Sequence, residues 1–299
     1  MSLVKTIASK SARILREEGV GGFARKGKNY LYHHYYQWKH PMAEQEHVFS
    51  DVLFINGCDE SVPHPARYRV THQREQLAAN HISSGEVYYA NLTLDQVRFY
   101  RTFIFFRCPY TDMIGEFVKL AKRLNKKVLF DVDDLVIDTK YTDTIKYLDS
   151  MSKDERALYD DGVRRMGKTL SLCDAAVTTT ERLAEELGHY VPEVFINRNT
   201  ASEEMWALSN EALKNKQDDP EHVRIGYFSG SLTHNDDFLL ILPAIEKVMS
   251  KYGNVQLHVV GELDLPKELQ RFADRVVSHP FMDWRKLPGL IAEVDINLA

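Results

Sequence analysis

The chain has 299 residues, of which 44% are apolar and 27% are charged, and its formal net charge is −5 at pH 7. These values are typical of a globular chain with room for two domains, and they exclude a general attraction to nucleic acid. No apolar run approaches the ~20 residues that span a bilayer, and the N-terminus lacks the apolar core of a signal peptide. Three widely spaced cysteines without a zinc-binding pattern indicate reduced thiols in the cytoplasm: Cys58, Cys108 and Cys173.

Residues 1–45 are rich in lysine, arginine and tyrosine. Apolar residues recur there at helical spacing, as at Val4, Ile7 and Ile14. Basic residues and interfacial aromatic residues on an amphipathic helix predict a segment that lies on an anionic membrane surface. A helix packed on its own domain with a solvated basic face is the alternative, because three glycines between positions 19 and 22 interrupt the pattern.

Residues 46–208 alternate apolar runs with helical stretches. Strands are predicted over 52–57, 86–90, 102–108, from 127 onward, 175–180 and 193–197, and helices over 67–80, 113–124, 153–172 and 181–187. This alternation predicts an α/β fold, with a parallel sheet that has helices on both faces.

A polar stretch, residues 209–222, is predicted to be a linker to a second unit over residues 223–299. In that unit strands are expected over 223–228, 255–261, 275–281 and 295–299, with helices over 235–251, near 267–272 and over 283–293. Because the sequence stops on a strand, we expect an incomplete second domain and an N-terminal portion of a longer protein. A complete small second domain is the alternative.

Residues 223–238 are the most informative stretch of the sequence. An apolar strand is followed by small residues and then by polar residues that suit a helix start. A small-residue loop at a helix N-terminus offers backbone N–H groups and the positive end of the helix dipole to an anion. The cleft between two α/β domains is where a nucleotide-bearing substrate would lie.

Several stretches in this order resemble the GT-B glycosyltransferases, and within them the retaining, nucleotide-sugar-dependent enzymes of bacterial surface-polysaccharide synthesis (family four-like). These stretches are 67–77, 127–138, 173–187, 224–238, 257–266 and 281–299. The resemblance implies two Rossmann-like domains, a nucleotide-sugar donor and a glycan or lipid-linked acceptor. It implies a cytoplasmic protein held at the inner face of the bacterial membrane. It calls for no metal and no cofactor other than the substrate.

The resemblance also implies a set of site residues. The donor's diphosphate or sugar would contact Gly226, Ser229, Gly230, Ser231, Thr233 and His234, and Gly261 would line the same cleft. In the first domain Arg67, Arg69 and Asp131 are expected to bind phosphate or acceptor. Asp133 and Asp134 are the candidate catalytic residues, as groups that bind sugar hydroxyls or orient the acceptor.

The chain departs from the family at two points. Asp133 stands where many relatives carry a histidine, and a late glutamate pair of the family would fall beyond residue 299. When the reaction retains the anomeric configuration, the leaving phosphate can accept the acceptor's proton, so no strong protein base is needed. The absence of the histidine is therefore compatible with sugar transfer. The second departure implies a fragment that binds nucleotide weakly and lacks activity.

Three other hypotheses remain open from the sequence. Asp131 and Asp133 at the end of a strand also match a phosphohydrolase of the haloacid dehalogenase type, with the first as nucleophile and the second as acid/base. The same carboxylates are of the kind that hold a divalent metal. The chain is alternatively a non-catalytic module of a polysaccharide assembly complex.

Overall fold

The computed structural model describes residues 11–12, 14–16, 19–24, 26–28, 30–31, 49–58, 63–217, 219–230 and 234–298. The chain forms two compact units, Met1–Thr200 and Ala201–Ala299. Most of the basic aromatic N-terminal segment lies outside the described residues, and those of its residues that are described, between 11 and 31, are helical. No helix in the described ranges is long and apolar enough to cross a membrane.

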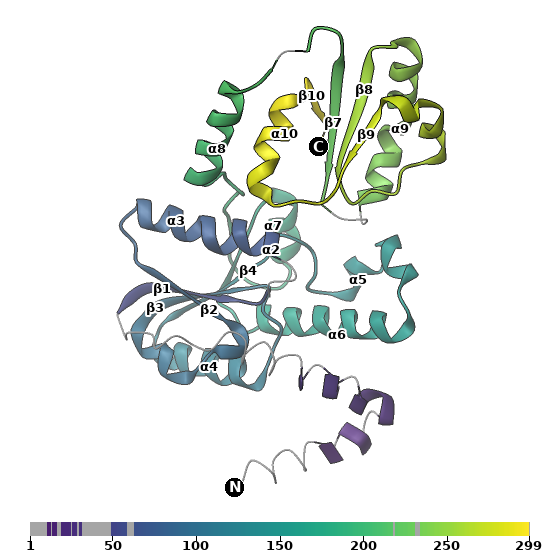
Figure 1. Ribbon diagram of the computed structural model, residues 1–299. Helices are drawn as coiled ribbons and strands as arrows, with labels where there is room; N and C mark the ends of the chain where they lie inside the picture. The colour runs from purple at the N-terminus through teal and green to yellow at the C-terminus, as the bar shows by residue number, and fades with distance from the viewer. Residues whose placement is uncertain are drawn as a thin grey trace. The chain divides into compact units, whose positions relative to one another are not determined.

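Unit 1 is built on a parallel sheet of six strands in the order β2-β1-β3-β4-β5-β6 (Figure 1). The strands are β1 (Ser50–Asn56), β2 (Ser84–Tyr88), β3 (Tyr100–Phe106), β4 (Lys127–Asp131), β5 (Ala175–Thr178) and β6 (Val194–Ile196). The longer helices are α3 (His72–Ala79), α4 (Asp112–Arg123), α6 (Lys153–Leu170) and α7 (Glu181–Leu187). Short helical segments are α2 (Pro63–Ala66), η1 (Arg67–Thr71), η2 (Tyr89–Asn91), η3 (Leu94–Phe99), α5 (Thr139–Thr142) and η4 (Lys146–Ser150).

Apolar cores lie on both faces of this sheet. One core joins Phe103 and Phe105 of β3 to Phe117 of α4, whose ring meets the Phe103 ring edge-on at 4.8 Å. The opposite core packs Phe54 and Phe106 against Val70 of η1. Strands buried on both faces are the pattern of a parallel α/β sheet, so the predicted α/β fold is confirmed for this unit.

Unit 2 holds a second parallel sheet, in the order β10-β7-β8-β9 (Figure 1). Its strands are β7 (Val223–Ser229), β8 (Val255–Gly261), β9 (Val276–His279) and β10 (Ile296–Leu298). Its helical segments are α8 (Glu203–Lys214), α9 (Asn235–Lys251), η6 (Lys267–Arg275), η7 (Trp284–Lys286) and α10 (Leu287–Glu293). In order of their appearance along the chain, these strands lie 3-2-1-4, which is the start of a Rossmann sheet. The predicted second Rossmann-like sheet is therefore confirmed.

The two faces of the unit 2 sheet differ in polarity. Alternate residues of β7 and β8, such as Ile225 and Leu257, pack on Phe238 of α9 in an apolar core. The residues between them include Arg224 and His258, which line a polar cavity instead.

Helix α8 corrects the predicted linker. Residues 209–214 were expected to be irregular, but they form the last turns of α8. Ser202 caps this helix by accepting a hydrogen bond from the Met205 N–H, and Glu203 and Glu204 suit its first turn. The polar composition of 209–222 concealed a helix whose cap lies seven residues before that stretch begins.

Two glycines of α6 give a matched test of its packing. A Cβ on Gly167 would lie 2.1 Å from the Ile137 carbonyl oxygen, whereas a Cβ on Gly162 would meet nothing within 4 Å. We expect Gly167→Ala to destabilise the protein by at least about 1–3 kcal/mol, because backbone must move. Gly162→Ala should stabilise it by about 0.5–1 kcal/mol, because alanine favours a helix interior. Urea unfolding of both variants measures this, and equal effects would contradict the packing of α6 on residue 137.

Candidate functional site

Strand order indicates where ligands bind in each unit. In parallel α/β sheets, ligands lie at the carboxyl ends of the strands, at the point where the strand order reverses. In unit 1 this switch point lies between β1 and β3, and in unit 2 it lies between β7 and β10. Each is the candidate site of its own unit.

The unit 1 switch point brings Gly57 and Arg107 together. A Cβ on Gly57 would lie 2.3 Å from the Arg107 carbonyl oxygen, so only glycine allows the ends of β1 and β3 to approach this closely. Arg107 has φ 45°, in the left-handed region that non-glycine residues rarely adopt. Such strained conformations cluster at functional sites.

Asp133 and Asp134 follow β4 and lie beside this arginine. Arg107 Nε donates to Asp133 Oδ1 at 2.7 Å. Nη2 forms an ion pair with the same oxygen at 2.7 Å and lies 3.9 Å from Asp134 Oδ2. The Asp133 side chain is 14% exposed and the Asp134 side chain is 61% exposed. Burial, the largest effect, lowers the pKa of Arg107, but Asp133, Cys58 and Asp134 outweigh it and the pKa is raised. The two candidate catalytic residues therefore lie together at the carboxyl edge of the unit 1 sheet. Arg107 lies there as well and was not predicted from the sequence.

Arg69 and Asp131 form a buried ion pair instead of an exposed phosphate site. Arg69 Nε donates to Asp131 Oδ1 at 2.8 Å and Nη2 donates to Oδ2 at 2.9 Å, with both side chains at 0% exposure. Gln73 donates to Oδ2 as well, at 2.7 Å. Because these groups are occupied and shielded from solvent, the prediction that Arg69 and Asp131 contact phosphate or acceptor is wrong.

Arg69 also connects distant parts of unit 1. Its Nη1 donates to the Asn197 carbonyl oxygen and to Asn199 Oδ1, so one guanidinium joins η1, β4 and the segment after β6. It comes from η1, a π-helical turn, and such turns are frequent at functional positions. Burial raises the pKa of Asp131 to about 6, because its effect is larger than the opposing effects of Arg69 and Gln73.

Arg67 lies on the same turn, with its Nη1 3.5 Å from His64 Nδ1. Its phosphate-binding role stays a prediction.

In unit 2 the predicted donor residues divide into two groups. Gly226 lies in the middle of β7, where a Cβ would press on Phe228 and Val294, so the prediction that it contacts a donor is wrong. Ser229 and Gly261 are paired at the carboxyl ends of β7 and β8. Gly261 has φ 97° and a Cβ there would lie 1.9 Å from the Ser229 carbonyl oxygen, so glycine is required.

Gly230 follows β7 and is exposed, with nothing within 4 Å of a Cβ at that position. Ser231 and Thr233 lie outside the described residues. His234 precedes α9, and its Nδ1 lies 3.0 Å from Asp237 Oδ2. The described residues of the loops after β7 and β8 and of the first turn of α9 carry no lysine or arginine but several carboxylates: Asp236, Asp237, Glu262 and Asp264. These negative charges oppose the binding of an anion at the N-terminus of α9.

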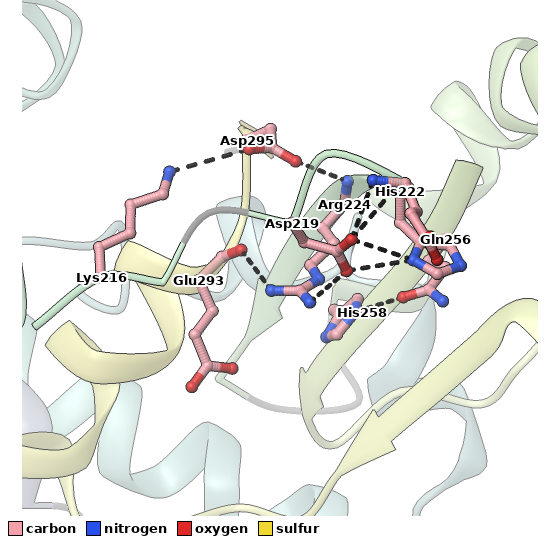
Figure 2. A network of polar contacts seen from close by, with 9 residues as sticks. Lys216, Asp219, His222, Arg224, Gln256, His258, Glu293 and Asp295 are labelled. Carbon is pink, nitrogen blue, oxygen red and sulfur yellow. Dashed lines mark hydrogen bonds and ion pairs between the residues drawn. The ribbon is translucent and has the colours of Figure 1, made fainter. Parts of the chain in front are cut away.

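A cavity of unit 2 lies at the opposite, amino ends of the strands. It measures about 1040 Å³ and is lined by residues of α8, β7, β8 and α10. Figure 2 shows the polar network around the lining residue Arg224, whose Nη2 donates to Asp219 and whose Nη1 donates to the Glu293 carbonyl oxygen. Lys216 pairs with Asp295 at 3.8 Å. Because Arg224 and Lys216 are already paired and the position of the cavity departs from the strand-end rule, this cavity is not the candidate donor site.

Among the described residues, no three histidine, cysteine or acidic side chains gather as metal ligands.

No protein-family model matches the sequence, and no curated protein does. Solved structures are similar in fold. An alpha-glucosyltransferase in complex with UDP matches with a TM-score of 0.46 and 9% identity, over 83% of this chain and 72% of that chain. UDP-GlcNAc 2-epimerase from Neisseria meningitidis bound to UDP-GlcNAc matches with a TM-score of 0.39 and 13% identity, over 81% and 75%. A Glycosylation Associate Protein complex from Streptococcus agalactiae matches with a TM-score of 0.33 and 13% identity, over 66% and 37%.

The Arg69–Asp131 pair is tested by comparison with an exposed pair of the same unit. Arg69→Met leaves a buried carboxylate without its charge partner, so it should lower the free energy of unfolding by about 3–5 kcal/mol at pH 7.5. The deficit should shrink as the pH falls from 7.5 to about 6. Arg69 lowers the pKa of Asp131, which is about 6 in its presence, so the carboxyl of the variant takes up a proton at higher pH than that of the wild type. Arg74→Met removes a pair that is 37% and 31% exposed and should cost less than about 1 kcal/mol. Equal losses in urea unfolding of both variants would contradict the assignment.

Proposed function

We propose that this chain belongs to a GT-B-type glycosyltransferase, which transfers a sugar from a nucleotide-diphosphate sugar to a glycan or lipid-linked acceptor. The paired strand ends Ser229 and Gly261 carry the proposal, because they hold the loops that follow β7 and β8 at close range on the carboxyl edge of a Rossmann-type sheet. The exposed Gly230 follows directly and leaves room for a ligand to approach the backbone. Donor binding in unit 2 and acceptor binding in unit 1 accord with this arrangement.

The chemistry expected of such an enzyme is retention at the anomeric carbon. Backbone N–H groups at the start of α9 (Asn235–Lys251) would stabilise the charge that develops on the leaving diphosphate. The leaving phosphate itself would take the acceptor's proton. Asp133 and Asp134 would then bind and orient hydroxyl groups.

A phosphohydrolase mechanism through Asp131 is not supported. Both oxygens of that carboxylate accept hydrogen bonds, from Arg69 and Gln73, and the side chain is fully buried. A nucleophile must reach phosphorus with a free oxygen. The Asp131/Asp133 hypothesis is therefore withdrawn.

One observation favours a non-catalytic module as the second candidate. The carboxylates of Asp236 and Asp237 occupy the first turn of α9, where a diphosphate would need positive charge. If they repel nucleotides altogether, the unit serves in assembly rather than transfer.

Nucleotide-sugar binding separates the two candidates. We expect a calorimetric titration with UDP-, GDP- and dTDP-sugars to detect binding of at least one donor. Gly230→Phe should abolish that binding without loss of stability, because Gly230 is exposed and no described residue lies within 4 Å of a Cβ at this position. Gly253→Phe is the control, since it lies in an equally open position before the amino end of β8. Absence of binding to every nucleotide sugar would contradict the transferase proposal and favour the assembly role.

The N-terminal segment is proposed to hold the protein at an anionic membrane surface. Deletion of residues 1–40 should release the protein from vesicles that contain phosphatidylglycerol, because the basic residues of the segment are lost. Sedimentation with vesicles of phosphatidylcholine alone is the control for charge-independent binding. Unchanged sedimentation of the deleted form would refute the membrane role.

A further inference from the structure

The ion pair at the unit 1 switch point does not use every polar atom of its two side chains. Nε and Nη2 of Arg107 both contact the same oxygen, Asp133 Oδ1. Among the described residues, no hydrogen bond involves Asp133 Oδ2 or Arg107 Nη1. An ionised carboxylate oxygen accepts hydrogen bonds and a guanidinium nitrogen donates them. The carboxyl edge of the unit 1 sheet therefore offers a hydrogen-bond acceptor and a hydrogen-bond donor next to each other.

The backbone fixes the position of this pair before any ligand arrives. The left-handed φ of Arg107 and the close contact of its carbonyl with Gly57 determine where the side chain leaves β3. The guanidinium is 19% exposed and lies 5.9 Å from the Phe106 ring centroid. Low exposure strengthens its bond to Asp133 relative to a pair in water. A binding group that is already ordered loses little entropy when a ligand binds.

Local charge selects the class of ligand. Arg107 contributes one positive charge, and Asp133 and Asp134 contribute two negative charges. A phosphate would meet two carboxylates and a guanidinium whose charge is already compensated. An uncharged hydroxyl group, by contrast, can donate to Asp133 Oδ2 and accept from Arg107 Nη1 at once.

Tyr159 adds a neutral aromatic neighbour to the pair. This residue comes from α6, and its phenol lies close enough to Asp134 and Arg107 to be influenced by their charges. A phenol keeps its proton at neutral pH even at its ordinary pKa of about 10. Burial, with the charge of Asp134, raises the pKa of Tyr159 further. It therefore adds no charge that would attract an anion.

We propose that Arg107 and Asp133 form a subsite for an uncharged, polyhydroxylated ligand, and that it takes the sugar end of the acceptor rather than a phosphate. The inference rests on the proposed function for the identity of that ligand as an acceptor. Arg107 acts in it both as a hydrogen-bond donor and as the residue that positions Asp133.

The Nε–H signal of Arg107 in the ¹H–¹⁵N spectrum of the full chain gives a direct test. The probes are methyl glycosides of glucose, galactose, mannose, rhamnose and N-acetylglucosamine, and, as anions, inorganic phosphate and glycerol 3-phosphate. At least one glycoside should shift the Arg107 signal in a saturable manner, and neither anion should. Arg107→Lys assigns the signal, and the Arg101 Nε–H is the internal control, because Arg101 lies on β3 with its side chain 86% exposed.

Asp133→Asn tests the acceptor half of the subsite. Its side chain keeps the shape of aspartate but loses the charge, so glycoside affinity should fall at least about tenfold. Asp51→Asn is the matched control at the amino end of the sheet and should leave affinity unchanged. A saturable shift with phosphate alone, a response to no probe, or equal affinity in Asp133→Asn would overturn the subsite.

The two proposals fail in different ways. Glycoside shifts at Arg107 without nucleotide-sugar binding would refute the transferase proposal and leave the subsite standing. Nucleotide-sugar binding with no glycoside response at Arg107 would refute the subsite alone.

Discussion

The buried pair of Arg69 and Asp131 is the interaction on which the first unit depends. A charged pair at 0% exposure is tolerated because three donors, two from Arg69 and one from Gln73, satisfy the carboxylate. The same guanidinium reaches the Asn197 carbonyl, so the end of β4, the turn η1 and the segment after β6 are fixed together. Asp133 follows two residues later, and its position is therefore set by this buried pair.

The three carboxylates at the end of β4 and directly after it lie in different environments. Asp131 faces inward and serves packing, while Asp133 pairs with Arg107 at the edge and Asp134 is mostly exposed. Three similar residues within four positions thus have three different roles, and only the last two are in reach of a ligand. In unit 2 the corresponding division lies along β7, where Gly226 packs inside and Gly230 opens to solvent.

Much of the fold follows from sequence because it depends on local patterns. Strands such as 102–108 and helices such as 235–251 have continuous or periodic apolar residues, and the structure confirms them with shifts of about two residues at the ends. Helix α8 was missed because its polar second half resembles a linker. Arg69 was misassigned and Arg107 missed because burial and ion pairing depend on residues far apart in sequence, such as Asp131 with Arg69. No local pattern reports such partners.

The central claim is that ligands bind at the carboxyl-end switch points, and hydrogen exchange measured by mass spectrometry tests it most directly. In the presence of a saturating nucleotide sugar, we expect slower amide exchange in peptides that cover residues 229–237 and 261–264. Peptides around Arg224 and Glu293, at the polar cavity of the amino ends, should be unaffected. Protection confined to that cavity, with none after β7 and β8, would contradict the account.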